Sequence, residues 1–362
     1  MKDSRDLIEK AFSGVRPERT PLFDLLANDA VIEYFADCSL EGMDDQVAVV
    51  QAAGNALDGT RSITTPNLEA TMWTDPAGNT RVSDRWTSWL KTPAFSDVDG
   101  WASWLRDYVE GPRDNSREPA HLDLTENSPD EERANELLDE QILYNETLRG
   151  TVNIHCTPST AINAILYYMG LDMFSYLWAD YRDLLKRWIG VYQRRTLDYI
   201  RVAAHHQTSP LAMIYADIAY KNGPMFSRQM FNEMGFFEEV AVICRACHEK
   251  DIKIVFHSDG NIMELLDDLA ATGIDGLNPI EKAAGMDIYE VRRRCPELTL
   301  VGGVDATHLL RSASPEQIRV ETRKIIDEVG PEGRLLIGSS TEVGNDIPLE
   351  NYLALHQEAM RS

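Results

Sequence analysis

Short apolar runs alternate with longer segments of helical periodicity along most of the chain. Eight of the runs have the length and composition of buried strands. They are 21–26, 56–63, 151–156, 211–216, 252–257, 273–278, 298–304 and 334–339. Helical patterns lie between them at 230–249, 262–272, 288–294 and 315–329, the last with Ser314 as N-cap and Pro315 at N1. Eight strand and helix units predict closure into a (β/α)8 TIM barrel that spans 1–362 as one domain.

An open doubly wound sheet is the alternative architecture. No G-x-G-x-x-G motif follows the first strand, and the pair Gly302-Gly303 alone is a weak signal. The barrel is therefore the favoured fold.

Two insertions, at about 64–105 and 106–150, interrupt the pattern. The first holds five of the seven tryptophans and a turn at 75–79, which predict a hairpin excursion over the barrel. We expect these rings to form the hairpin's own core, although one or two could cover an aromatic substrate.

The second insertion is acidic. Residues 107–146 hold thirteen acids and three arginines, and a capping box at 128–131 predicts a helix to about Arg149. This segment is expected to be either a contact in a homodimer or a solubilising surface.

Composition narrows the classes of partner. The formal charge of −24 over 362 residues disfavours nucleic acid and anionic membranes as partners. The N-terminal residues have no apolar signal segment, and no run of 18 apolar residues occurs, which indicates a cytoplasmic protein. Five cysteines are expected to be reduced thiols.

The ends of the eight runs are rich in carboxylates and imidazoles. These residues are Asp24, Asp58, His155 with Cys156, Asp217, His257 with Asp259, Glu281, Asp305 and the tract 339–342. Active sites of barrels lie at the carboxyl ends of the strands, so the group predicts a catalytic site there. The alternative for each single residue is that it caps the following helix.

Among these strand ends, the stretch Ile254–Asn261 is the most specific indication of a functional site. It delivers His257 and Asp259 from a buried strand onto a tight turn, where they could hold zinc or form a proton-transfer pair.

Several tracts resemble the uroporphyrinogen decarboxylase superfamily, and within it the corrinoid-dependent methyltransferases. The tracts are DIAYKNGP at 217–224 with Ser227, HSDGN at 257–261, GLNP at 276–279, GGVD at 302–305 and PLEN at 348–351. The resemblance covers nearly the whole chain and implies a (β/α)8 barrel.

The departures separate two branches of that superfamily. The decarboxylases carry an arginine-bearing N-terminal tract, whereas 21–28 has no arginine, and Thr341 stands at their histidine position. The methyltransferases bind zinc through His-x-Cys and a distant Cys, which correspond here to His257, Asp259 and Thr341. A thiolate site is thereby excluded at these positions, and a harder site of His257 with carboxylates remains.

The residues, together with the resemblance, imply three sets of site residues. The catalytic set is His257, Asp259, Asp217, Asp58 and Tyr168. The substrate-binding set is Asp24, Asn28, His155, Tyr167, Ser227, Asn278, Asp305 and Ser340. The metal-binding set, for Zn²⁺, is His257, Asp259, Glu281 and Glu342.

The leading function that the resemblance implies is methyl transfer from a small methoxy- or methylamine-type substrate. The acceptor is a Co(I) corrinoid carried by a separate partner protein, and a Lewis acid or a proton donor such as His257 stabilises the leaving oxygen. The second hypothesis is a decarboxylase of the uroporphyrinogen decarboxylase type that acts on a non-porphyrin or porphyrin carboxylate and uses Asp58, a tyrosine and His257. A non-catalytic barrel that binds a small ligand is the third.

Two further motifs are interpreted as structural rather than as cofactor- or metal-binding. Cys244 and Cys247 have the spacing of a haem attachment site but lie on one apolar helix face, which favours core packing. His205 and His206 are expected in a loop after a basic helix, as a helix cap rather than as metal ligands.

Overall fold

The fold is an eight-position parallel barrel. A computed structural model of the chain describes residues 4–40, 45–61, 66–67, 69–111, 147–157, 159–206 and 209–361. Seven strands form one parallel sheet in the order β13-β12-β11-β10-β7-β6-β2. They are β2 (Gly59–Arg61), β6 (Val152–Cys156), β7 (Leu211–Tyr215), β10 (Lys253–His257), β11 (Gly276–Asn278), β12 (Thr299–Val304) and β13 (Leu335–Ser339).

The eighth position closes the barrel. Leu22 pairs with Ile337 of β13 and Phe23 pairs with Gly59 of β2, both in parallel. The segment around these two residues therefore joins the two edges of the seven-stranded sheet. All eight predicted runs contribute to the barrel, and the predicted fold is confirmed.

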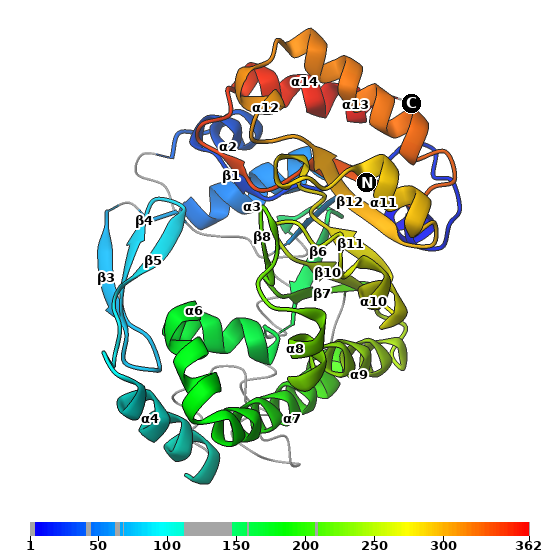
Figure 1. The fold of residues 1–362 in the computed structure, drawn as a ribbon. Coiled ribbons are helices and arrows are strands. Elements are labelled where there is room, and N and C mark those ends of the chain that lie inside the picture. The colour runs from blue at the N-terminus through cyan, green and yellow to red at the C-terminus, as the bar shows by residue number, and fades with distance from the viewer. Residues whose placement is uncertain are drawn as a thin grey trace.

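Helices cover the outside of the barrel (Figure 1). Those of the barrel are α1 (Ser4–Phe12), α2 (Asp29–Ala36), α3 (Asp45–Ala56), α6 (Ala161–Asp180), α7 (Arg182–His206), α8 (Arg228–Glu233), α9 (Phe236–His248), α10 (Leu266–Ala271), the 3-10 turn η1 (Lys282–Ala284), α11 (Ile288–Arg294), α12 (Leu309–Ser312), α13 (Pro315–Val329) and α14 (Leu349–Ala359). Helix α13 begins with the predicted cap, because Ser314 and Gln317 form a capping box. The pattern at 230–249 is split instead, since Gly235 has a φ of 71° and separates α8 from α9.

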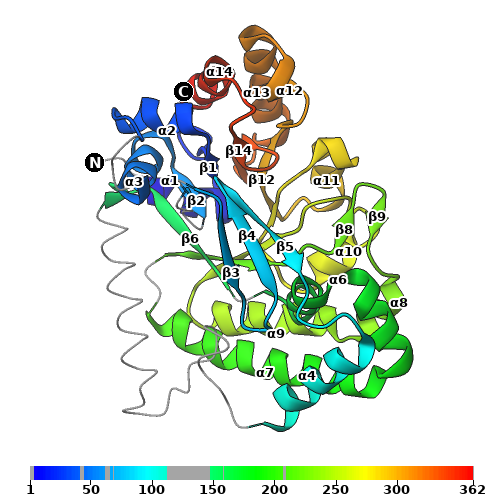
Figure 2. The same ribbon diagram turned by 90° about the vertical axis from the view of Figure 1, so that its left-hand side faces the viewer.

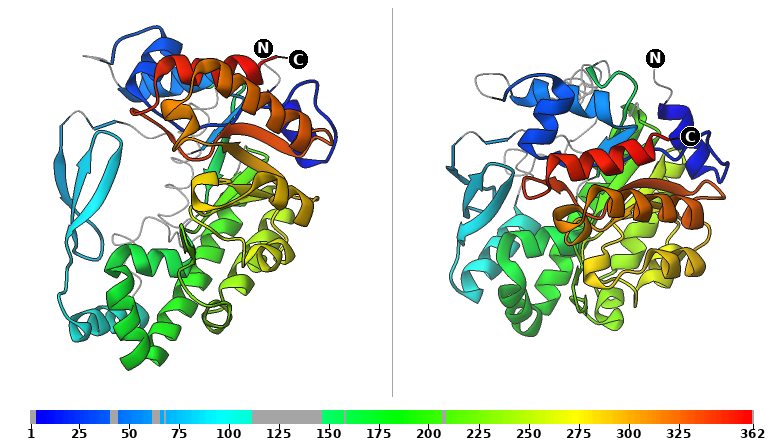
Figure 3. Two further views of the ribbon diagram at one scale, coloured as in Figure 1. Left: turned by 45° about the horizontal axis from the view of Figure 1, so that its top comes forward. Right: turned by 90° about the horizontal axis from the view of Figure 1, so that it is seen from above.

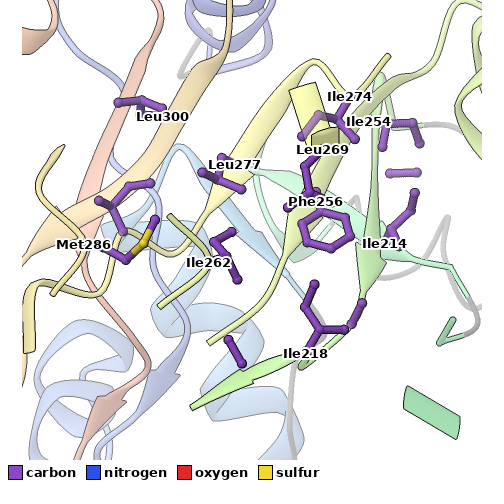
Figure 4. Packing of buried hydrophobic residues seen from close by; sticks show 14 of the residues in the cluster. Ile214, Ile218, Ile254, Phe256, Ile262, Leu269, Ile274, Leu277, Met286 and Leu300 are labelled. Carbon is purple, nitrogen blue, oxygen red and sulfur yellow. The ribbon is translucent and has the colours of Figure 1, made fainter. Parts of the chain in front are cut away.

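Buried apolar residues form two layers. The outer layer lies between the strands and the helices, where Ile214, Ile254 and Phe256 pack against Leu269 and Ile274 (Figure 4). The inner layer fills the barrel and includes Met213, Val255, Val301 and Leu336. The strands thus bury both faces, as parallel strands do.

Helix α1 closes the amino end of the barrel. Its residues Ile8 and Phe12 belong to the inner layer. A Cβ atom at Gly59 would lie 3.1 Å from Ile8, and one at Gly276 would lie 3.1 Å from Phe12. Both glycines therefore face the interior and leave room for this plug.

The first insertion forms an antiparallel sheet beside the barrel (Figure 2). It contains β3 (Thr71–Thr74), β4 (Thr80–Asp84) and β5 (Thr87–Thr92), and helix α4 (Val98–Glu110) follows it. The predicted turn joins β3 to β4, where the carboxylate of Asp75 accepts from the backbone N–H of Ala77 and Asn79 and from Arg81. The hairpin excursion is therefore present.

The expectation for the tryptophans holds only in part. Trp73 and Trp89 are 39% and 47% exposed on the sheet. Trp101 is buried and packs edge-on against Trp104, which in turn contacts Trp188 of α7. The aromatic core of this region is therefore built by helices, because the three-stranded sheet offers its own rings no second layer.

The two ends of the described chain are brought together (Figure 3). Phe35 of α2 packs on His356 of α14 with ring centroids 4.7 Å apart, and β1 (Leu26–Ala27) pairs with β14 (Val343–Gly344). The helix predicted to run to Arg149 lies outside the described residues up to position 146. None of the helices in the described ranges combines the length and the apolar composition that a membrane span requires.

Candidate functional site

The inner layer identifies which side chains reach the carboxyl end of the barrel. Side chains two residues apart on a strand share a face. Met213 and Val255 face the interior, so Tyr215 and His257 do as well, at the ends of β7 and β10. Their rings stack with centroids 4.3 Å apart and an interplanar angle of 22°.

The same alternation places two more residues in this top layer. Arg61 lies two residues after the inward-facing Gly59, and Asn278 lies two residues after Gly276. The guanidinium of Arg61 lies 5.1 Å from the centroid of the Tyr215 ring. Three neighbouring strands and β2 thus deliver an imidazole, an amide, a phenol and a guanidinium to the barrel mouth.

Asn278 fixes the tautomer of His257. The amide nitrogen of Asn278 donates to the carbonyl of Val301 at 3.1 Å, which leaves its Oδ1 as an acceptor. Nδ1 of His257 lies 2.7 Å from that oxygen and therefore carries the proton. Nε2 is then a bare acceptor, and it is buried with no hydrogen-bond partner among the described residues.

His257 is also held in its neutral form. Burial and the charge of Arg61 lower its pKa to about 3, although the hydrogen bond that it donates to Asn278 acts to raise it. A neutral imidazole with a free Nε2 is the form that binds metal ions.

Two carboxylates lie beside this nitrogen. Oδ1 of Asp217 is 3.7 Å from Nε2 of His257 and accepts from the backbone N–H of Asp259 at 3.2 Å. Oδ1 of Asp259 is buried and, like Nε2, has no hydrogen-bond partner in the described part of the chain. One ligand atom from each of the three residues lies within 4.8 Å of the others.

The pKa values of both carboxyl groups are raised. Burial, with the charges of Asp217, Glu281 and Glu342, raises the pKa of Asp259 to about 7. Burial and the charge of Glu342 also raise the pKa of Asp217. Negative charge is therefore concentrated here beyond what Arg61 offsets, which favours a cation.

The turn after β10 sets the position of Asp259. Gly260 has a φ of 84°, and a Cβ atom there would lie 2.6 Å from the carbonyl oxygen of Ala219. Its N–H donates to Glu281 at 2.9 Å. Glu281 thus supports the turn, while Glu342 is exposed at the rim.

The donor set fits a divalent cation. One neutral imidazole and two carboxylates are ligands for zinc and for harder divalent ions, and Asn278 accepts the outer hydrogen bond that metal-binding histidines donate. The two unpartnered atoms of His257 and Asp259 provide the structural evidence for this fit. Of the predicted metal ligands, His257 and Asp259 come together with Asp217.

Asp58 does not join this site. Helix α3 continues through the alanine-rich segment to Ala56, so Asp58 lies at the amino end of β2, opposite to Arg61. Its carboxylate accepts from Ser4 at 2.8 Å, from both Nη atoms of Arg19, and from the N–H of Leu22. The structure gives it a role in holding the N-terminal segment.

Asp24 also lies outside this site, because its carboxylate is engaged in buried hydrogen bonds. It is 2% exposed and accepts from the N–H of Ser339 at 2.8 Å, from the hydroxyl of the same residue, and from the hydroxyl of Tyr352 on α14. Burial raises its pKa to about 7. It fastens the first barrel segment to β13 and to the last helix.

Other residues of the predicted substrate-binding set cap backbone groups. The residues are Asn28 at α2, Ser227 at α8, Asp305 after β12 and Ser340, which accepts from the N–H of Ala306. The capping alternative therefore describes these four residues.

The predicted tyrosines lie on α6 against the first insertion. The guanidinium of Arg81 is 3.5 Å from the centroid of the Tyr167 ring, and Tyr168 packs on Trp104. His155 follows the inward-facing Ile154 and so faces away from the barrel interior, with a pKa lowered to about 4 by burial. The rings of the two tyrosines pack on the first insertion and on each other, and His155 points away from the interior, so the three residues do not form part of the cluster around His257.

Cys244 and Cys247 are 1% and 2% exposed in the outer core, as the packing interpretation predicts. His248 instead bonds Asp275 at 2.7 Å. His205 and His206 are the last residues of α7 and do not lie in a loop, which corrects the expected boundary.

The sequence interpretation missed Arg61 and Tyr215. Both follow inward-facing residues by two positions, so strict alternation along β2 and β7 was the signal that could have found them. The prediction considered only carboxylates and histidines at the strand ends, so it omitted the guanidinium of Arg61 and the phenol of Tyr215.

Comparisons with known proteins agree with this architecture. The family described as uroporphyrinogen decarboxylase (URO-D) matches residues 112–361, more than half of the chain. A solved methyltransferase from Methanosarcina mazei has the same fold, with a TM-score of 0.68 and 14% identity over 99% of this chain and 98% of that one. No curated protein matches the sequence. The chain belongs to the uroporphyrinogen decarboxylase family.

Proposed function

We propose that the protein transfers a methyl group from a small methoxy- or methylamine-type substrate to the Co(I) corrinoid of a separate protein. The observation that carries the proposal is the bare, buried Nε2 of His257 beside Asp217 and Asp259 at the barrel mouth. The fold that the chain shares with the methyltransferase from Methanosarcina mazei supports it.

His257, Asp217 and Asp259 would hold a divalent cation such as Zn²⁺. When bound, the cation supplies Lewis-acid stabilisation of the atom from which the methyl group departs. This donor set has no thiolate, so it suits an oxygen-containing substrate better than a thiol.

The remaining chemistry falls to the protein's own side chains. The bond between the methyl carbon and the substrate heteroatom breaks as a new bond to cobalt forms, and the heteroatom keeps the bonding electron pair. Asn278 keeps the proton of His257 on Nδ1, so His257 presents only an acceptor to the substrate. A protonation route would therefore use Asp259, whose pKa of about 7 lets it carry a proton near neutrality, rather than His257.

The methyl acceptor must reach the mouth of the barrel. The proposed corrinoid protein would dock over the carboxyl ends of the strands, where Tyr220 and Glu342 are exposed. The position of Asp58 speaks against the decarboxylase hypothesis, which gives this residue a catalytic role, because Asp58 lies at the opposite end of β2 from the cluster.

The test is a single-turnover methyl transfer assay under anaerobic conditions. The protein is mixed with a Co(I) corrinoid protein and a panel of methoxylated and methylated-amine compounds, and the absorbance change from Co(I) to methyl-Co(III) is followed. We expect conversion with at least one compound and loss of it in His257→Ala. His248→Ala, at an exposed histidine outside the site, is the matched control and should retain it.

Two results would contradict the proposal. One is binding of these compounds without any methyl transfer, which would favour the non-catalytic barrel. The other is carbon dioxide release from a carboxylated analogue, which would favour the decarboxylase.

A further inference from the structure

Arg61 stands apart from the other groups of the top layer. It is a basic side chain whose charge acts on His257, Asp217 and Asp259 together. Among the described residues it forms no ion pair, and its side chain contacts Tyr215, over whose ring the guanidinium lies and with which it shares a hydrogen bond. A guanidinium carries five N–H donors in a planar arrangement, more than its contact with Tyr215 can use.

The ion pairs of the top layer indicate what those donors receive. A divalent cation between Asp217 and Asp259 would engage both carboxylates and leave Arg61 without a direct anionic partner. Glu281 and Glu342 form no ion pair with Arg61 among the described residues: the first accepts from the N–H of Gly260, and the second is exposed at the rim. An anionic group on the substrate would supply that partner.

We infer that Arg61 binds a carboxylate of the substrate, so that the methyl donor is a methylated acid held between Arg61 and the His257 centre. The inference rests on the proposed function and names its substrate class. Guanidinium and carboxylate pair through two parallel hydrogen bonds, which would fix both the position and the orientation of the donor. Tyr215 lies between the two binding points, since it contacts the guanidinium and stacks on His257.

Calorimetric binding of matched neutral and anionic probes tests the inference. The probes are 4-methoxybenzoate with 4-methoxybenzamide, and methoxyacetate with methoxyacetamide, each added to zinc-loaded protein. We expect at least one acid to bind about 10-fold or more tightly than its amide, the range that charge-assisted hydrogen bonds provide. Arg61→Gln should abolish this preference while amide binding stays within about threefold, and Arg61→Lys should restore part of it.

Elemental analysis of each variant accompanies the titrations. Arg228→Gln, at an arginine with a 66% exposed side chain, is the matched control and should behave as the unaltered protein. The inference is overturned if no acid binds, if acids and amides bind alike, or if Arg61→Gln weakens both alike or releases the zinc. Acid-selective binding that needs Arg61 but is not followed by methyl transfer would refute the proposed function and leave the carboxylate site standing.

Discussion

Oδ1 of Asn278 accepts a hydrogen bond from Nδ1 of His257 at 2.7 Å, while the amide nitrogen of Asn278 donates to the carbonyl of Val301. The two bonds leave the second nitrogen of the histidine directed toward Asp217 with its lone pair free. Outer hydrogen bonds of this kind orient metal-binding histidines.

Asn278→Ala should therefore weaken metal binding without removing any ligand. We expect a fall in zinc affinity of about 10- to 100-fold, the usual effect of losing such an outer partner. Competition against a chromophoric chelator measures it. An unchanged affinity would mean that the orientation of His257 does not depend on this bond.

Metal affinity should rise with pH through about 7. The pKa of Asp259 is raised to about 7, so the carboxyl group must lose its proton before it can act as a ligand. His257 adds no such dependence in this range, because its pKa is lowered to about 3. Chelator competition between pH 5.5 and 8.5 provides the profile, and a flat profile would speak against Asp259 as a ligand.

Metal-free protein should be stabilised by Asp259→Asn at pH 8 and not near pH 4. A carboxyl group whose pKa is raised on folding contributes stability below its unfolded pKa and loses that contribution as the pH rises through its folded value. The shift to about 7 sets an upper limit of about 4 kcal/mol. Denaturant unfolding measures the difference in the free energy of unfolding between the variant and the unaltered protein, and Asp172→Asn, at an exposed position, is the control. In excess zinc the unaltered protein should be the more stable of the two. Equal stabilities at pH 8 would contradict the raised pKa.

Asp24→Ala should cost stability and leave zinc binding unchanged. The substitution leaves the backbone N–H of Ser339 and the hydroxyl of Tyr352 without their buried acceptor, a loss of about 2–4 kcal/mol. Urea unfolding and elemental analysis of the same preparation check both parts. Loss of zinc from a folded variant would contradict the prediction and indicate that Asp24 takes part in metal binding.

The sequence predicted the barrel because each buried strand is a local signal. Apolar runs of strand length occur wherever β-strands are covered on both faces, so all eight positions could be read without knowing how they pair. The capping box at Ser314 is equally local, and α13 begins there. Asp58 was misplaced for the same reason, since the run 56–63 does not show that α3 still occupies Ala56.

The site could be predicted only in part, because its membership depends on long-range contacts that a sequence pattern does not show. His257 and Asp259 were found because one short turn carries both. Asp24 has the same residue type at a strand end, yet its partners lie more than 300 residues away along the chain. Whether a carboxylate lines the mouth or holds two elements together is decided by that long-range packing. Arg61 could not be assigned to the site from the sequence, because only the closed barrel places the end of β2 near the strands that carry Tyr215 and His257.

The most direct test of the metal centre is the zinc content of the protein after loading and desalting, measured by elemental analysis. The account predicts about one equivalent per chain in the unaltered protein and in His248→Ala, and loss of it in His257→Ala and Asp259→Asn. Retention of zinc in His257→Ala, or its absence from the unaltered protein, would contradict a cation site at His257, Asp217 and Asp259.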